Sequence, residues 1–142
     1  MAVMRDRPYV NSNFVVDLGT GDGNSVTAGF AEVIFPAFSI GSTNLHRSDP
    51  AGAHESSRLI LKRGLVGALD LYSWWSSAPR GKTPKRRTVK ITLLGEDHST
   101  VVMTWLFRKA YPTTLSYSPL RATEGSVVME TVELAFDSME MS

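Results

Sequence analysis

The feature that most constrains the fold of this 142-residue chain is a change in the spacing of its apolar residues at Gly64. Before the glycine, Leu59 and Leu61 alternate with Arg58, Ile60 and Lys62 on the opposite face, which is the period of a strand. After it, apolar residues recur at helical spacing. This second stripe contains Leu65, Ala68, Leu69, Leu71, Tyr72 and Trp75. The residue before a proline avoids the helical conformation, so Pro79 limits the predicted helix to about residues 65–78.

Most of the remaining pattern predicts strands. Runs rich in β-branched and aromatic residues indicate extended segments at 13–18, 26–35, 88–94, 100–109 and 127–136. A segment rich in Ser, Gly, Asp, Asn and His predicts a long loop over about 39–57, and Pro112 to Gly125 is rich in turn residues. Six or so strands around one short helix predict a single mainly β domain spanning residues 1–142.

Two of these strands, Val26 to Phe35 and Val101 to Phe107, carry apolar residues on both faces. A sheet with one face in water alternates more cleanly between apolar and polar residues. We therefore expect a neighbouring subunit to cover part of this surface.

Composition excludes some classes of site and partner. The chain has no cysteine, so it can form neither a disulfide framework nor a thiolate metal site. A net charge of +1 gives no overall field that would favour nucleic acid or an anionic membrane. No apolar run approaches the ~20 residues that span a bilayer, so we expect no stable membrane insertion.

The segment from Phe14 to Asn24 resembles the glycine-rich first motif of S-adenosylmethionine-dependent methyltransferases. That motif requires a helix directly after the glycines and an acidic residue ~20 positions further on. Here a β-branched and aromatic run follows, so a hairpin turn is the favoured interpretation. The methyltransferase remains a distant alternative.

Three other groups of polar residues do not predict a site. Gly81-Lys82-Thr83 lacks the earlier glycine of a phosphate-binding loop. Glu96 to Ser99 are consecutive in a predicted turn and cannot converge as a hydrolytic triad. His46 and His54 lack zinc-type spacing. We expect no catalytic residue, cofactor or metal.

Four ordered blocks carry a resemblance to a known family: residues 58–75, 88–95, 102–112 and 127–136. Together they resemble the inner-tube proteins of contractile phage tails and of related injection systems, over most of Pro8 to Asp137. The resemblance implies a β-sandwich or barrel-like body with one flanking helix. It further implies hexameric rings in which sheets join edge to edge and close an inner β-barrel, which removes exposed strand edges.

The function implied by this resemblance is mechanical. Stacked rings form a rigid hollow tube, which sheath contraction drives through a target envelope while DNA or protein cargo occupies the lumen. The implied partners are other copies of the chain, a sheath protein, baseplate or spike hub proteins and terminator proteins. Assembly in the cytoplasm is expected, followed by incorporation into a phage tail or an injection particle. A secreted hexameric carrier or chaperone ring for effectors is the alternative function.

The strand pattern also predicts which side chains line the channel. Val132 and Leu134 fall on the core side of their strand. In the tube that the resemblance implies, residues on the opposite sides of this strand and of residues 88–94 are predicted to face the lumen. They are Lys90, Thr92, Met129, Thr131 and Glu133.

Contacts with other subunits or the sheath are predicted in three places: the N-terminal segment, the long loop, and the basic loop from Arg80 to Arg87, which holds five cations in eight residues. The residues predicted to make these contacts are Tyr9, Leu45, His46, Arg47, Lys85, Arg86 and Arg87.

Overall fold

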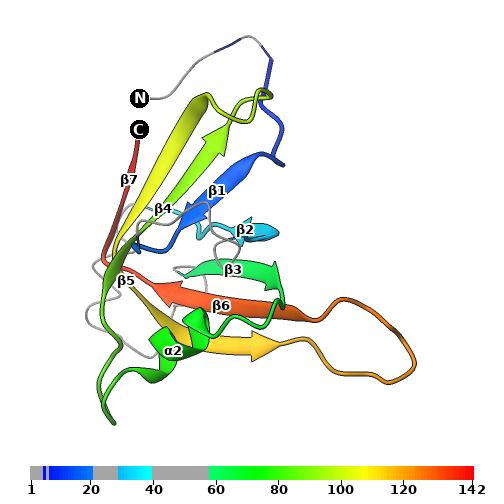
Figure 1. The fold of residues 1–142 in the computed structure, drawn as a ribbon. Coiled ribbons are helices and arrows are strands. Elements are labelled where there is room, and N and C mark those ends of the chain that lie inside the picture. The colour runs from blue at the N-terminus through cyan, green and yellow to red at the C-terminus, as the bar shows by residue number, and fades with distance from the viewer. Residues whose placement is uncertain (1–4, 6, 21–28, 40–57) are drawn as a thin grey trace.

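The computed structural model describes residues 5, 7–20, 29–39 and 58–142. Within these residues it contains seven strands and one helix (Figure 1), which confirms the predicted mainly β fold with a single flanking helix. In chain order the elements are β1 (Phe14–Asp17), β2 (Glu32–Ile34), β3 (Leu59–Gly64), α2 (Asp70–Ser76), β4 (Arg87–Leu94), β5 (Val101–Tyr117), β6 (Met129–Ala135) and β7 (Ser138–Met141).

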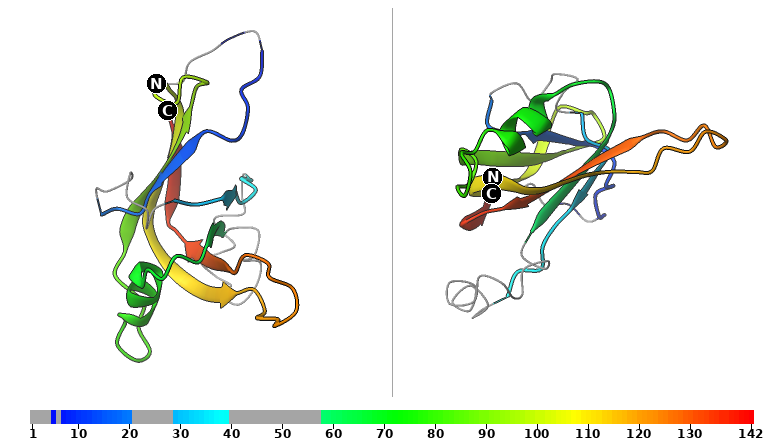
Figure 2. Two further views of the ribbon diagram at one scale, coloured as in Figure 1. Left: turned by 45° about the vertical axis from the view of Figure 1, so that its right-hand side comes forward. Right: turned by 90° about the horizontal axis from the view of Figure 1, so that it is seen from below.

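The strands form one antiparallel sheet in the order β1-β4-β5-β6-β3-β2, with β7 paired to β5 off this path. The long strand β5 belongs to both halves of the sheet. Its first part pairs with β4 and β7, and its last part pairs with β6. Figure 2 shows β5 curving between the two halves, so that β3 and β6 lie across the direction of β1 and β4.

The hydrophobic core lies between the two halves of the sheet. Val89 and Ile91 of β4 belong to the same buried cluster as Leu61 of β3 and Val132 of β6. Phe107 of β5 is fully buried within it. Because strand residues alternate between faces, the opposite sides of β4 and β6 point away from this core. The predicted inward positions of Val132 and Leu134 on β6 are confirmed.

The predicted turn-rich segment beginning at Pro112 is wrong in its first part, because β5 continues to Tyr117. A register shift between Pro112 and Thr114 accommodates the proline within the strand. Proline is tolerated in a strand at such irregularities because it has no N–H to donate to the ladder. Just before this point Lys109 has a φ of 57°, and there β5 leaves β7 and begins to pair with β6.

The helix is shorter than predicted, spanning Asp70–Ser76 rather than residues 65–78. Gly67 has a φ of +84°, which lies outside the right-handed helical region and prevents an earlier start. The buried face of α2 is formed by Leu71 and Trp74. Leu69 and Tyr72, which lie on the predicted apolar stripe, are exposed instead.

Two further strand predictions change. Only Glu32–Ile34 of the predicted strand 26–35 forms β2, and residues 26–28 lie outside the described part. The C-terminal strand β7 was not predicted, because its Ser-Met-Glu-Met sequence is too short to show a period. Of the predicted loop 39–57, residues 40–57 also lie outside the described part.

The turn after β1 depends on Gly19, whose φ is +85°. A Cβ atom at this position would lie 2.9 Å from the backbone oxygen of Thr88. We expect Gly19→Ala to lower the free energy of unfolding by about 2 kcal/mol or more, because left-handed backbone strain and a steric clash add together. Chemical denaturation measures this loss.

The matched control is Gly81→Ala. Gly81 has a similar φ of +80°, but a Cβ there would meet nothing within 4 Å. This variant should lose only the strain component, about 1 kcal/mol. Equal losses in the two variants would show that the contact with Thr88 is unimportant.

Candidate functional site

A buried ionic cluster fixes α2 to the sheet. Arg63 of β3 is 1% exposed, and its Nε donates to Oε1 of Glu130 at 2.8 Å. The two residues are direct cross-strand partners on β3 and β6. The guanidinium also donates to both carboxylate oxygens of Asp70, the first residue of α2. The hydroxyl of Tyr117, on β5, donates to the second oxygen of Glu130 at 2.8 Å.

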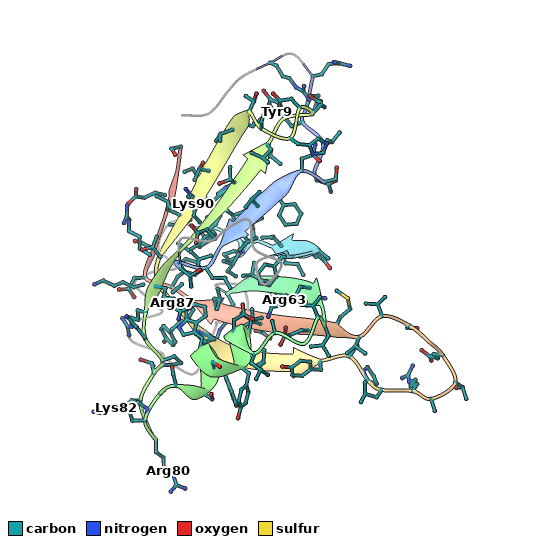
Figure 3. The ribbon with its side chains drawn as sticks, in the orientation of Figure 1. Tyr9, Arg63, Arg80, Lys82, Arg87 and Lys90 are labelled. Atoms are coloured by element: carbon teal, nitrogen blue, oxygen red, sulfur yellow. The ribbon has the colours of Figure 1, made fainter. Side chains whose placement is uncertain are left out.

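The charges in this cluster support one another. Burial alone would lower the pKa of Arg63, but its hydrogen bonds to Asp70 and Glu130 outweigh that effect, so the pKa is raised. The pKa of Tyr117 is raised mainly by desolvation of its hydroxyl and, to a smaller extent, by its hydrogen bond to Glu130. Arg63 therefore stays cationic, and the cluster joins β3, β5, β6 and α2. Figure 3 shows Arg63 at the centre of this region, between the sheet and α2.

Sequence reasoning missed this cluster. Glu130 shares the core side of β6 with Val132 and Leu134, and Arg63 shares the core side of β3 with Leu61. A charged residue at a core position of each strand was the available signal. Buried charges are rarely tolerated unless they are paired, so the two positions could have been matched.

The basic loop between α2 and β4 is anchored to α2 by contacts with Trp74. The indole N–H of Trp74 donates to the carbonyl oxygen of Lys85 at 2.6 Å, and Pro84 is buried. Arg87 lies over the Trp74 ring at 4.6 Å from its centroid and is half-buried. Arg87 therefore also has a role in the fold of its own subunit.

The other cations of the loop differ in their surroundings. Arg86 is exposed, lies over the Tyr111 ring at 5.1 Å and approaches Asp137 at 3.9 Å. The side chains of Arg80, Lys82 and Lys85 are exposed and have no acidic partner among the described residues. Figure 3 places Arg80 and Lys82 at the end of the molecule beside α2.

The predicted lumen residues fall into two groups on different halves of the sheet. Lys90 and Thr92 lie on β4, where their cross-strand partners are Leu106 and Thr104 of β5. Figure 3 shows Lys90 on the half of the sheet that contains β1 and β4, apart from β6. The second group, Met129, Thr131 and Glu133, lies on β6 and is half-buried. The described subunit therefore does not bring the two groups together.

The N-terminal contact candidate Tyr9 is held against its own subunit. The guanidinium of Arg5 lies 3.8 Å from the Tyr9 ring centroid and donates to both carboxylate oxygens of Glu96, at 2.8 Å and 2.7 Å. These contacts join the N-terminal segment to the β4–β5 turn. The other predicted contacts, Leu45, His46 and Arg47, lie outside the described residues.

The polar residues after β4 form a turn, as predicted. The carboxylate of Asp97 accepts the backbone N–H groups of Ser99 and Thr100 at 3.0 Å and 2.9 Å, and His98 has a φ of 59°. The side chains do not converge as a hydrolytic triad. Among the described residues, no group of three His, Cys, Asp or Glu side chains is arranged to hold a metal ion. Nor does this part of the chain contain a helix able to cross a bilayer.

Asp97 gives a prediction about acid stability. Its hydrogen bonds from Thr100 and Ser99 hold the pKa of Asp97 well below its usual range. A carboxyl group with a depressed folded-state pKa contributes stability above its unfolded pKa of about 3.9, and this contribution is lost as the pH falls through the folded pKa. Asp97→Ala should therefore flatten the fall in stability below about pH 4. Thermal unfolding between pH 2 and 7 tests this, and an unchanged acid slope would contradict it.

The structure is similar to chains from solved assemblies of contractile injection systems. One is a chain of the sheath–tube complex of the extracellular contractile injection system PVC in its extended state. Its TM-score is 0.72 with 20% sequence identity, covering 96% of this chain and 93% of the other. Another is a chain of the anti-feeding prophage tube-terminating cap, with a TM-score of 0.72 and 18% identity, covering 100% and 95%.

Hcp1 from Flavobacterium johnsoniae shares the fold at a TM-score of 0.54 and 10% identity, covering 91% of this chain and 94% of Hcp1. The described chain therefore shares its fold with chains of these two injection-system assemblies and with Hcp1. A sequence comparison with curated proteins found no match.

The sequence itself identifies the family. The family described as "T4-like virus tail tube protein gp19" matches residues 10–140, which is nearly the whole chain. The chain belongs to this tail tube family, and it is a structural subunit of a tube. The antiparallel pairing of β1 with β4 also disfavours a methyltransferase, whose cofactor site requires parallel strands joined by helices.

Proposed function

We propose that six copies of this chain form a ring and that the rings stack into the rigid inner tube of a contractile tail or injection particle. The observation that carries the proposal is the family match over residues 10–140. The role proposed for the chain is mechanical rather than catalytic.

The edges of the sheet support ring formation. Among the described strands, β1 pairs only with β4, and β2 pairs only with β3. The last part of β5 pairs only with β6. Unpaired strand edges promote association unless another strand covers them. Pairing of such edges between neighbours would join their sheets and close a barrel around a channel.

The lumen proposal retains both groups of residues, Lys90 and Thr92 on β4 and Met129, Thr131 and Glu133 on β6, as candidates. The outer face of β6 presents Thr131 and Glu133, with Lys62 of β3 and Ser116 of β5 as the cross-strand partners of Thr131. The outer face of β4 presents Lys90 and Thr92. In a ring, only a face that points toward the axis lines the channel, and a mixed polar face would let DNA or protein cargo slide without adhering.

The proposed partners follow from this role. A sheath surrounds the tube, a baseplate or spike hub begins it, and a terminator ends it. The structurally similar proteins come from a sheath–tube complex, a terminating cap and a six-fold symmetrised baseplate. We propose that assembly takes place in the cytoplasm and that the chain leaves as part of a particle. The candidates for contacts with other copies or with the sheath remain those predicted from the sequence: Tyr9, Leu45, His46, Arg47, Lys85, Arg86 and Arg87.

Negative-stain electron microscopy of the purified chain tests the proposal. Hexameric rings or tubes with sixfold end views are the expected result. A chain that stays monomeric at high concentration would refute ring formation. Stable isolated rings that never stack would favour the secreted carrier instead.

A further inference from the structure

We propose that the outer side of α2 and the loop after it bind the headgroup surface of an anionic phospholipid bilayer. This surface is called the α2 lipid face, and it consists of Val66, Leu69, Tyr72 and Trp75 together with Arg80, Lys82 and Lys85. The contact is peripheral, because the seven residues of the helix rise only about 10 Å, whereas the hydrocarbon core of a bilayer is about 30 Å thick.

The charge around the α2 lipid face is one-sided. Residues 65–87 contain five cations and a single carboxylate, Asp70, which is already bound to a buried arginine. Two of the cations lie over aromatic rings of the subunit. The other three are exposed and have no acidic partner among the described residues: Arg80, Lys82 and Lys85. Anionic headgroups attract such a local group of cations even though the whole chain carries a net charge of only +1.

The apolar part of the α2 lipid face points away from the core. Leu69, Tyr72 and Trp75 are spaced three residues apart and share the outer side of the helix. Leu69 is 68% exposed and Val66 is 63% exposed. The rings of Tyr72 and Trp75 lie together, with centroids 6.4 Å apart. Tyrosine and tryptophan combine an apolar ring with a polar group, and they favour the interface between a membrane and water for that reason.

The position of this surface suits a broad, flat partner. Figure 1 and the left view of Figure 2 show α2 and the loop after it at one end of the subunit, opposite the N-terminal segment and the β4–β5 turn. Arg80 and Lys82 lie at this end in Figure 3. The bond from the Trp74 indole to the Lys85 carbonyl oxygen ties the loop to α2 and keeps the cations beside the apolar side chains.

A protein is a less suitable occupant of the α2 lipid face. A second copy of the chain would have to supply carboxylates, but four of its exposed ones are paired with arginines of their own subunit: Glu96, Glu124, Asp137 and Glu140. A different acidic protein would need carboxylates and apolar groups placed to match a projecting end. An anionic bilayer offers headgroup charge above apolar chains over any area, so it needs no such match.

The purpose of this contact rests on the proposed function. A tube driven through a target envelope would meet phospholipid headgroups along its outer side. Weak contacts from many stacked copies add up to firm binding. They would hold the bilayer against the tube and limit leakage around it during penetration.

Vesicle flotation of the purified full chain tests the proposal. Vesicles of phosphatidylcholine with about one-third phosphatidylglycerol are compared with vesicles of phosphatidylcholine alone. The chain should bind the anionic vesicles at least about tenfold more tightly, with an affinity that falls as salt rises because screening weakens the attraction. Tryptophan emission should shift to shorter wavelength on binding. Trp75→Phe should remove most of that shift and retain binding, because Trp74 is already buried.

Two variants separate the halves of the α2 lipid face. Arg80→Glu/Lys82→Glu/Lys85→Glu should weaken binding to anionic vesicles by about tenfold or more and remove most of its salt dependence. Val66→Ser/Leu69→Ser should weaken binding without changing the salt dependence. The matched control, Arg7→Glu/Lys109→Glu/Arg121→Glu, changes the net charge by the same amount at exposed cations elsewhere and should leave binding within about twofold of the parent.

Equal affinity for the two kinds of vesicle, or an equal loss in the matched control, would overturn the proposal. So would a chain that binds no vesicle but binds a glutamate-rich helical peptide through this surface, because the partner would then be a protein. Flotation does not require rings. Vesicle binding by a chain that never forms rings would refute the proposed tube alone, and rings that bind no vesicle would refute the lipid contact alone.

Discussion

Replacing Arg63 with methionine should lower the free energy of unfolding by about 3–5 kcal/mol. Removing one partner of a buried ion pair leaves an unpaired charge in the core, and Glu130 is itself 1% exposed. The change also removes the bond to Asp70 at the start of α2. Denaturant unfolding of the unassembled subunit gives the loss directly.

The control for Arg63→Met is Arg108→Met. Arg108 pairs with Glu140 at 2.7 Å, but the two side chains are 46% and 56% exposed. Exposed pairs contribute about 0–1 kcal/mol, so this variant should remain close to the parent. Arg63→Met combined with Glu130→Met should recover much of the lost stability, because a well-packed apolar pair can replace a buried ionic one. A double variant as unstable as the single one would show that loss of the hydrogen bonds, rather than the unpaired charge of Glu130, causes the loss of stability.

Phe107→Ala should cost about 3–5 kcal/mol, since truncating a buried aromatic ring leaves a cavity that the surrounding structure fills only in part. Phe107 is fully buried in β5, and its ring lies edge-on to Phe136 with centroids 5.0 Å apart. It also lies 6.3 Å from the ring of Phe35. Thermal and denaturant unfolding measure the loss.

The control for Phe107→Ala is Leu120→Ala, on the β5–β6 hairpin. Leu120 is 83% exposed, so its truncation should change stability by no more than about 0.5 kcal/mol. A small loss at Phe107 would mean that the two halves of the sheet can close around the cavity.

Local periodicity was enough to predict most strands and their inward faces. Leu59 and Leu61, and likewise Val132 and Leu134, alternate with more exposed residues, and all four are fully buried. The helix was placed correctly but made too long, because spacing alone could not reveal that Gly67 adopts a left-handed conformation. Of the two adjacent tryptophans, Trp74 lies in the core at 2% exposure, whereas Trp75, which belongs to the predicted apolar stripe, is 41% exposed.

Features that depend on pairing between distant segments were harder to predict. From the sequence alone, Pro112 predicts the end of a strand. In the structure β5 continues through it, because a register shift in the pairing with β6 accommodates the proline. Arg63 and Glu130 are 67 positions apart, and only the register of β3 and β6 makes them neighbours. The lumen and contact residues depend on how copies of the chain meet, and neither sequence periodicity nor a single subunit determines that arrangement.

The continuity of β5 has a mechanical consequence. One uninterrupted backbone of 17 residues runs from the half of the sheet containing β4 to the half containing β6. The two halves therefore cannot slide or rotate past each other unless that backbone bends. A load applied to one end of the subunit is therefore carried to the other by covalent bonds and ladder hydrogen bonds, through the point near Lys109 where the strand changes partners.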